Sequence, residues 1–248
     1  MSVASNVYGL HPVQSLLAKT PERVRQLWVQ AGREDERLGA ILQLAERAGI
    51  SVERVRRESL DRMAAGGRHQ GVVASALEPP ALGEDDLEAL LDRLEGPPFL
   101  LVLDGVQDPR NLGACLRTAD AAGVHAVIVP RDRATGLTGA GRKAAAGAAE
   151  TVPLVRVVNL ARCLRMLKAR GVWLVGADAD GSGSVFDADL AGPLALVMGA
   201  EGTGLRRLTR EACDLLVSLP MRGSVESLNV AVAAGIFMYL ALGRRLPG

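Results

Sequence analysis

The feature that most constrains this chain is a series of short apolar runs in its C-terminal two thirds. The first run is Phe99–Leu103, and we expect further strands at 126–129, 155–157, 172–177, 194–199 and 215–219. Segments with apolar residues at helical spacing lie between several of them. A strand that is apolar on both faces needs cover on both faces, which is typical of a parallel sheet flanked by helices. The pattern predicts an α/β fold with a mostly parallel sheet.

The first eighty residues show a separate alternation of helix and strand patterns. We expect helices at 11–19 and 37–49, and strands at 24–29, 50–55 and 71–77. Two consecutive prolines in the stretch Leu77–Gly83 predict an extended linker. The chain is therefore divided into a small α/β domain at 1–78, a linker with a first helix at 79–97, and a larger domain at 98–248.

Composition excludes several classes of protein. The 29 Lys and Arg residues and 28 Asp and Glu residues leave a net charge of +1, which excludes a strongly basic tail but not a local basic patch. Only 3% of residues are aromatic, which disfavours a stacking platform for unpaired bases. The three cysteines form no CxxC motif, so we expect small core residues in a reducing, cytoplasmic protein. Three widely spaced histidines disfavour a metal site.

Two further segments bear on the membrane question. The N-terminus lacks a basic region followed by an apolar run, so we expect no signal peptide. The apolar stretch 230–243 is shorter than the roughly 18 residues that suggest a membrane span. It predicts a buried helix within 228–242 instead, and because that helix is apolar on every side it needs more cover than a surface helix.

Polar residues and glycines gather in three loops after predicted strands, at 101–123, 196–205 and 219–233. Ligands of parallel sheets bind at the loops beyond the carboxyl ends of the strands, so we place the site there. Gly199, Gly202 and Gly204 do not follow the GxGxxG order of a dinucleotide site. The sequence also lacks the GxSxG, HExxH and P-loop motifs.

Each polar residue in these loops allows a structural and a functional interpretation. Asn111 either caps a helix or acts in the site. Arg117 is either a surface arginine or, because its helix is expected to be largely buried, a charged group that needs an anionic partner. Glu201 is either solvated at a turn or directed into a cleft, and Asn229 is either a structural network residue or part of the site.

Together, the three loops resemble the signature motifs of the SpoU family of RNA 2′-O-ribose methyltransferases. The first motif is Asn111-Leu-Gly-x-x-x-Arg117-Thr. The second is Met198-Gly199-x-Glu201-Gly202-x-Gly204-Leu205, and the third is Leu219-Pro220-Met221-x-Gly223-x-x-x-Ser227-Leu228-Asn229-Val230-Ala231. The segments VYGLHPVQSLL and RHQGVVA resemble the N-terminal substrate-binding domain of the bacterial 23S rRNA guanosine-2′-O-methyltransferase branch, a domain similar in fold to ribosomal protein L30e.

The resemblance implies an activity, a cofactor and a topology. The implied activity is methylation of a ribose 2′-hydroxyl, that of a guanosine in 23S rRNA, with S-adenosylmethionine as cofactor. The fold would contain a C-terminal trefoil knot and the protein would be a homodimer. Gly199, Leu219 and Leu228 would contact the cofactor mainly through backbone groups. The implied catalytic residues are Asn111, Arg117, Glu201, Ser227 and Asn229.

The role of Arg117 and the identity of the RNA are left open. Arg117 would act on the 2′-hydroxyl, either in proton transfer or as an electrostatic clamp that holds the adjacent phosphate. Candidate RNA contacts are basic residues near the loops and in the N-terminal domain: Arg54, Arg56, Arg57, Arg68, Arg110 and Arg142. The alternatives are the same chemistry on tRNA or another rRNA nucleotide, and an RNA-binding protein without catalysis.

Overall fold

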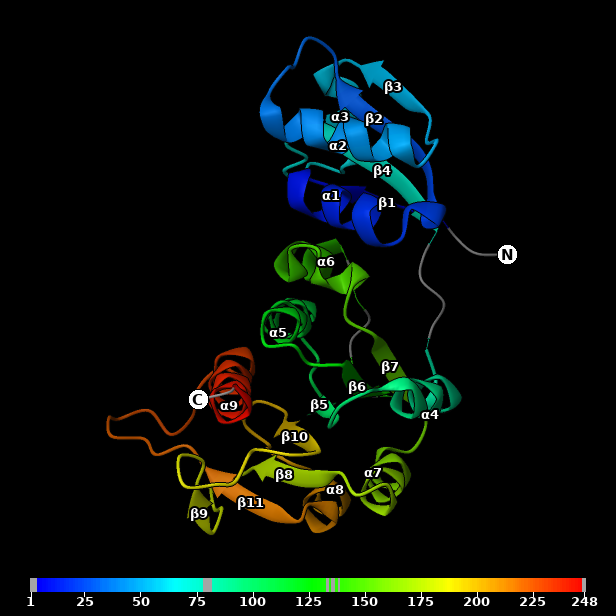
Figure 1. Cartoon of the computed structure of the whole chain (residues 1–248). Helices are drawn as coiled ribbons and strands as arrows, with labels where there is room; N and C mark the ends of the chain where they lie inside the picture. The colour runs from blue at the N-terminus through cyan, green and yellow to red at the C-terminus, as the bar shows by residue number, and fades with distance from the viewer. Residues whose placement is uncertain (1–3, 78–81, 133, 135–136, 138, 247–248) are drawn as a thin grey trace. The chain divides into compact units, whose positions relative to one another are not determined.

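The chain forms two compact units in the computed structural model, which describes residues 4–77, 82–132, 134, 137 and 139–246. Unit 1 comprises residues 1–80 together with 146–151, and unit 2 comprises residues 81–145 and 152–248 (Figure 1). The centre of the expected linker lies outside the described residues. The division differs from the sequence-based one, because residues 146–151 join unit 1 although they lie inside the 98–248 range.

Unit 1 is a four-stranded mixed sheet with helices on both faces. Its strands are β1 (Ala4–Tyr8), β2 (Val24–Gln30), β3 (Val52–Val55) and β4 (Val72–Leu77), in the order β1-β4-β2-β3. Strand β4 is antiparallel to β1 and β2, whereas β3 is parallel to β2. Sequence patterns missed β1 because it lies at a sheet edge and only one of its five residues, Val7, is buried.

Alternating residues of β4 divide the core of unit 1 into two layers. Val72 and Ala74 pack with α1 (Leu10–Lys19) and α2 (Glu36–Arg47). Val73 packs on the opposite face with Leu60 of the short helix α3 (Arg57–Met63). The period of two along a strand explains this division. Helix α3 was not predicted, since its seven residues carry little helical periodicity.

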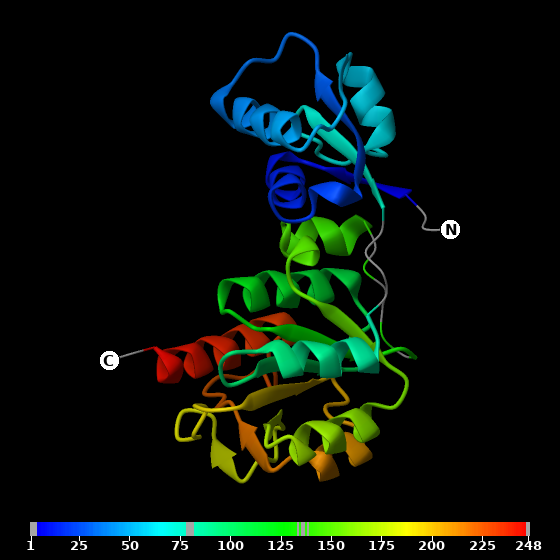
Figure 2. The same cartoon turned by 45° about the vertical axis from the view of Figure 1, so that its right-hand side comes forward.

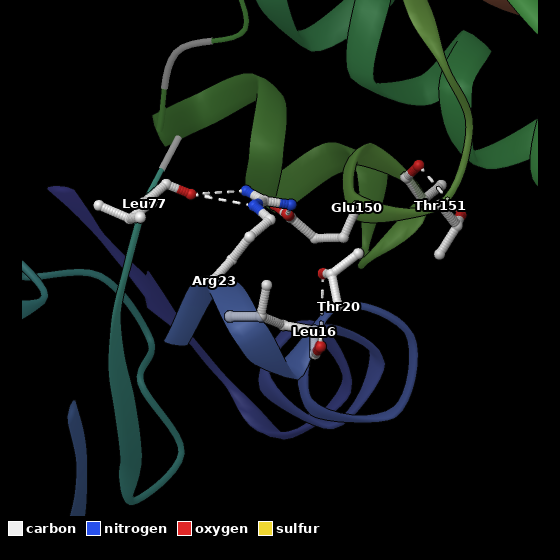
Figure 3. A network of polar contacts seen from close by, with 7 residues as sticks. Leu16, Thr20, Arg23, Leu77, Glu150 and Thr151 are labelled. Carbon is white, nitrogen blue, oxygen red and sulfur yellow. Dashed lines mark hydrogen bonds and ion pairs between the residues drawn. The ribbon is translucent and has the colours of Figure 1, made fainter. Parts of the chain in front are cut away.

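Residues 146–151 are tied to unit 1 by a buried ion pair (Figure 3). The Arg23 Nη1 atom donates to Oε2 of Glu150 at 2.6 Å, and the two side chains are only 13% and 3% exposed. The Nε and Nη2 atoms of Arg23 donate to the Leu77 carbonyl oxygen at 3.0 and 2.9 Å. The Arg23 side chain therefore joins the end of β4 to the 3-10 turn η2 (Ala148–Glu150).

Unit 2 contains a seven-stranded sheet in which every described strand pair is parallel, as predicted. The strand order is β7-β6-β5-β10-β8-β11-β9. The bounds are β5 Phe99–Asp104, β6 Ala126–Pro130, β7 Leu154–Val157, β8 Trp173–Ala177, β9 Gly183–Ser184, β10 Leu194–Gly199 and β11 Leu215–Ser218. Strand β5 is buried along its whole length, as its unbroken apolar run indicates.

Helices cover both faces of this sheet (Figure 2). Their bounds are α4 Glu84–Arg93, α5 Pro109–Ala121, α6 Gly139–Ala145, α7 Leu160–Ala169, α8 Arg207–Ala212 and α9 Val230–Arg245. Helices α4 and α7 share a core with Leu100, Val102 and Val197. Helix α9 packs against β10 and α5, and α5 packs against α6. Within the described part of the chain, no helix is long and apolar enough to cross a membrane.

Helix α5 begins three residues earlier than the cap interpretation of Asn111 requires. Asp108 is the N-cap, and its side chain accepts a hydrogen bond from the Arg110 N–H at 2.8 Å. Pro109 occupies the first helical position, where its fixed φ and missing N–H favour a helix start. The cap hypothesis for Asn111 was therefore wrong, and its side chain is left for other contacts.

Replacement of Gly113 by alanine tests the close approach of α5 and α6. A Cβ on Gly113 would lie 2.1 Å from the Gly141 carbonyl oxygen, so the helices would have to separate. We expect Gly113→Ala to lower the free energy of unfolding by about 1–3 kcal/mol, the usual cost of overpacking. The matched control is Gly39→Ala in α2, where an added Cβ has open space and should stabilise by about 0.5–1 kcal/mol. Denaturant unfolding measures both, and equal effects would contradict the described packing.

Candidate active site

A cavity of about 350 Å³ opens at the carboxyl ends of β8, β10 and β11. Its walls come from the ends of these strands, the loops that follow them and the start of α9. The lining residues are Ala177, Asp178, Ala179, Met198, Gly199, Ala200, Glu201, Gly202, Gly204, Val217, Leu219, Met221, Glu226, Ser227, Leu228, Val230, Ala233 and Phe237. Both the location and the volume are typical of a small-molecule site in a parallel α/β fold.

The lining of the cavity combines apolar walls with negative charge. The charged lining residues are Asp178, Glu201 and Glu226, and none of the Lys and Arg residues that the structure describes lines the cavity. Asp178 is partly neutralised because its Oδ2 accepts from the Arg210 Nε at 2.8 Å. An electronegative cavity with apolar walls suits a ligand that has apolar groups and a net positive charge.

The loop after β10 is folded back on itself and brings Glu201 to the cavity. Ala200 and Gly204 exchange two backbone hydrogen bonds, at 3.1 and 3.0 Å. A Cβ on Gly199 would lie 2.2 Å from the Gly204 carbonyl carbon, so only glycine allows this approach. Gly202 and Gly204 have φ values of +77° and +64°, in the left-handed region that glycine tolerates.

One carboxylate and two amides from three different loops meet beside the cavity. Glu201 Oε1 accepts from Asn229 Nδ2 at 2.7 Å, from Asn111 Nδ2 at 3.2 Å and from the Val230 backbone N–H at 3.2 Å. Asn229 Nδ2 also donates to Asn111 Oδ1 at 3.0 Å. We call Asn111, Glu201 and Asn229 the polar triad. It joins residues that are up to 118 positions apart in the sequence.

Asn229 has a second role as the N-cap of α9. Its Oδ1 accepts from the backbone N–H groups of Ala231 and Val232, at 2.9 and 3.4 Å. The same side chain thus uses its oxygen for the helix and its nitrogen for the triad. Position 229 therefore fixes both the start of α9, which begins at Val230 rather than near 228, and the orientation of Glu201.

The structure places most of the sequence-predicted site residues together. Gly199, Leu219, Ser227 and Leu228 all line the cavity that Glu201 also lines. Arg117 is not among the residues that line the cavity.

Arg117 is exposed, which agrees with its interpretation as a surface arginine, although α5 has a buried face. On α5, Leu112, Cys115, Leu116 and Ala119 form the buried face, and Arg117 lies outside it. Among the residues that the structure describes, Arg117 has no hydrogen-bond or ion-pair partner. A structural ion pair between Arg117 and Glu201 is therefore absent from this part of the chain, and the guanidinium is available to a ligand.

The basic residues proposed to contact RNA are mostly exposed. In unit 1, Arg54 lies on the edge strand β3, Arg56 and Arg57 lie at the start of α3, and Arg68 lies in the turn before β4. In unit 2, Arg110 is exposed in the first turn of α5, and Arg142 is half-buried in α6 with a partner of its own.

Sequence analysis missed the two acidic groups Asp104 and Asp178, which lie at the carboxyl ends of β5 and β8. The signal for both was a carboxylate at the end of an apolar strand, which requires compensation when buried.

The cysteines behave as core residues: Cys115 and Cys163 are buried, Cys213 is half-buried, and burial raises the pKa of each thiol to about 12. No group of three or more potential metal ligands occurs within the described residues.

Comparison with known proteins relates the chain to RNA methyltransferases. The sequence model of the SpoU rRNA Methylase family matches residues 98–239, and that of the RNA 2′-O ribose methyltransferase substrate binding domain matches residues 6–80. A 23S rRNA (guanosine-2′-O-)-methyltransferase, RlmB, of Pseudomonas aeruginosa is 53% identical over 247 residues, which cover 100% of this chain and 99% of the relative. The RlmB protein of Escherichia coli is 50% identical over 239 residues, 96% of this chain and 98% of the relative.

Solved structures agree with this relationship. The SpoU methyltransferase AviRb from Streptomyces viridochromogenes, in complex with the cofactor AdoMet, superposes with a TM-score of 0.78 at 27% identity and covers 97% of this chain and 90% of its own. An AdoMet-bound rRNA methyltransferase from Sinorhizobium meliloti gives a TM-score of 0.79 at 25% identity, with 98% and 88% coverage. Because the family match spans more than half of the sequence and relatives above 50% identity span nearly all of it, the chain belongs to the SpoU rRNA methylase family.

Proposed function

We propose that this protein transfers a methyl group from S-adenosylmethionine to the ribose 2′-hydroxyl of a guanosine in 23S rRNA. The observation that carries the proposal is the polar triad, which brings the three family motifs together at the mouth of an acidic cavity. The relatives that match nearly the whole chain are named for this reaction. A ribosomal RNA substrate also assigns the protein to the cytoplasm.

The cavity fits S-adenosylmethionine by the chemistry of its lining. The cofactor carries a sulfonium and an ammonium group against one carboxylate, so it is cationic overall, and every charged residue that lines the cavity is acidic. The apolar side chains of Leu219, Leu228 and Phe237 offer a surface for an adenine ring. Backbone groups of this loop are accessible to a ligand because Gly199, Gly202 and Gly204 have no side chains to cover them. When bound, the cofactor supplies an activated methyl group.

Arg117 serves the RNA rather than the cofactor. Its guanidinium stays protonated at neutral pH and presents a planar fork of donors that matches a phosphate. In the proposed complex it holds the phosphate next to the reacting ribose and stabilises negative charge that develops on the 2′-oxygen. An electrostatic clamp is favoured over a role as base, because no described residue lies against Arg117 to accept its proton.

The polar triad holds the hydroxyl and orients it. Three donors occupy Glu201 Oε1, whereas Oε2 accepts no hydrogen bond from any described residue. The free oxygen is the acceptor we assign to the 2′-hydroxyl proton. Asn111 and Asn229 keep the carboxylate in one orientation, and Ser227 offers a hydroxyl on the cavity wall. Alignment of this kind supplies much of the rate of a group transfer.

Unit 1 is assigned to RNA recognition, with an L30e-like fold. The support is its four-stranded sheet covered by helices on both faces and the match of residues 6–80 to a substrate-binding family. The exposed arginines at positions 54, 56, 57 and 68 give it a basic surface. Phosphate contacts from such residues position an RNA without reading its sequence.

The C-terminal part of unit 2 is proposed to form a trefoil knot. Strand β11 lies toward one edge of the sheet, between β8 and β9, yet the next helix α9 packs on the central strand β10 and on α5. The chain therefore returns across neighbouring strands after residue 218 rather than ending at the edge. Knots are rare in proteins, so a fold-level argument from sequence would not have produced one.

The site of methylation tests the proposed function. Purified protein would be incubated with labelled S-adenosylmethionine and with 23S rRNA, 16S rRNA or total tRNA that lack the modification. Mass spectrometry of nuclease fragments then locates the product. We expect one 2′-O-methylguanosine in 23S rRNA. Methyl transfer confined to tRNA would show that the protein is a tRNA methyltransferase instead. Binding of 23S rRNA without methyl transfer would show that the protein binds RNA but does not catalyse the reaction.

Arg117→Ala should abolish methyl transfer while leaving the fold intact. Loss of an electrostatic group of this kind costs about 10²–10⁴-fold in rate. Because Arg117 is exposed and unpaired among the described residues, the melting temperature and cofactor affinity should stay unchanged. Arg117→Lys should be almost as damaging, since lysine lacks the planar fork. Single-turnover methylation and thermal unfolding measure the two effects.

The matched control for this substitution is Arg165→Ala on α7, another exposed arginine of unit 2. It should retain the transfer rate of the unmodified protein. Near-normal transfer by Arg117→Ala, or inactivity accompanied by a large loss of thermal stability, would remove Arg117 from the catalytic site.

RNA affinity should depend on salt through the arginines of unit 1. Each phosphate contact contributes a slope of about −0.7 to −0.9 in log K against log salt. Combined replacement of Arg54, Arg56 and Arg57 by Gln should weaken RNA binding and flatten the slope by up to about three such increments, without a change in cofactor affinity. Filter binding at several salt concentrations measures both quantities. An unchanged slope would show that this surface does not contact the RNA backbone.

The protein should be a homodimer through α9. Val232 and Tyr239 lie seven residues apart on α9 and are each 53% exposed, and Leu246, the residue that follows the helix, is 60% exposed, which leaves exposed apolar surface along α9 and at its end. Val232→Glu with Tyr239→Glu should therefore produce monomers. Leu208→Glu on α8, at a residue 54% exposed, is the control and should stay dimeric. Analytical ultracentrifugation at low micromolar concentration measures the mass of each protein in solution. A mass of 26.0 kDa for the unmodified chain would contradict the dimer.

A further inference from the structure

A buried carboxylate lies at the end of the central strand β5 and outside the polar triad. The side chain of Asp104 is 0% exposed, although every other residue of the strand is apolar. Its Oδ1 accepts from Arg206 Nε at 2.5 Å and also contacts Arg206 Nη2, and its Oδ2 accepts from the Arg206 backbone N–H at 3.1 Å. Among the described residues, Arg206 supplies all of the hydrogen bonds to this carboxylate. A charge buried in a sheet is tolerated only with such compensation.

Arg206 lies directly after the loop that carries Glu201. The loop is closed at its base by the paired backbones of Ala200 and Gly204, so residues 201–203 form a compact tip. The Asp104 carboxylate holds both the backbone and the guanidinium of Arg206, which fixes the direction in which the chain leaves this loop. The position of Glu201 thus depends on a group in a neighbouring strand.

Asp104 also lies at the start of the segment that leads to Asn111. Strands β5 and β10 are parallel, and Asp104 is in register with Gly199, the last residue of β10. After them, Gly105 turns with φ +92°, and a Cβ on it would be in ordinary contact with Ala200 at 3.6 Å. The segments that carry Asn111 and Glu201 therefore leave the sheet side by side, and the ion pair ties them where they diverge.

We propose that Asp104 and Arg206 are positioning residues for methyl transfer: the ion pair between the buried carboxylate and the Arg206 side chain, which is 42% exposed, keeps Glu201 in hydrogen-bond register with Asn111 and Asn229. The inference rests on the proposed function for its activity readout. An apolar pair would fill the same space, but only the charged pair constrains the angle between the two segments. The energy of an ion pair falls off with misalignment, whereas apolar packing is non-directional.

The experiment compares single and paired substitutions. Arg206→Met leaves the Asp104 carboxylate buried without a side-chain partner and should lower the melting temperature. Asp104→Leu combined with Arg206→Met removes both charges and should recover most of the stability, as replaced buried pairs often do. The single-turnover rate of the double variant should nevertheless stay at least about tenfold below that of the unmodified protein, a loss of the size that misplacement of a reacting group causes. The control is Arg207→Met, whose partner Glu211 lies on the exposed face of α8, and its rate should be normal.

A second readout does not depend on activity. The side-chain amide protons of Asn111 and Asn229 are hydrogen-bonded in the triad, so their nuclear magnetic resonances should shift in the double variant and remain unchanged in Arg207→Met. If the double variant fails to fold, Arg206→Lys replaces it in the experiment. This substitution keeps the positive charge but removes the planar guanidinium, so it should show the same amide shifts and a reduced rate of methyl transfer.

Two results would overturn the inference: a folded double variant that transfers methyl groups within twofold of the normal rate, or triad amide resonances that do not move in a folded variant. Failure of the unmodified protein to methylate any RNA would instead contradict the proposed function. In that case the amide resonances would still decide whether the ion pair positions Glu201.

Discussion

The contact on which the site depends is the hydrogen bond from Asn229 to Glu201, at 2.7 Å. A single asparagine side chain caps α9, orients a carboxylate and reaches Asn111 on another helix. Together these contacts join three segments of the chain. Their value comes from the orientation they impose, because hydrogen-bonded networks of this kind hold every member to one geometry. The rest of unit 2 brings the three loops close enough for this contact to form.

The parallel sheet is the reason that the three loops meet. Strands β5 and β10 are neighbours, so their carboxyl ends release the Asn111 and Glu201 segments at adjacent points of one edge. Helix α9 then returns to β10 and brings Asn229 to the same place. The buried Asp104 carboxylate, in register with Gly199 at the ends of these two strands, pairs with Arg206 just after the Glu201 loop. Scaffold and site are therefore linked through charged and polar contacts as well as through apolar packing.

Much of this architecture could be predicted from the sequence because it follows local rules. Continuous apolar runs such as Phe99–Leu103 identified the buried strands, and the three motifs identified the residues that line the cavity or form the triad. Long-range features were not accessible in this way. The ion pair between Arg23 and Glu150 places residues 146–151 in unit 1, and nothing in the local pattern of that segment indicates it.

Two residues of α5 depend on short-range helix geometry. Asn111 was a plausible helix cap by residue type, but Asp108 followed by Pro109 is a stronger start signal, and the asparagine is used elsewhere. For Arg117 the sequence left two alternatives, a surface arginine or a charge on a largely buried helix. Helical periodicity places its side chain outside the stripe that packs on the sheet. In both cases short-range helix geometry, applied to α5, predicts what the structure shows: a helix start before Asn111 and an exposed Arg117.

The most direct test of the account is a crystal structure of the protein with S-adenosylmethionine bound. The account predicts density in the cavity between the loops at 199–205 and 219–228, with the methyl group directed toward the polar triad and Arg117 left free for the RNA. Density for the cofactor at another place, or in this cavity with the methyl group directed away from Glu201, would contradict it.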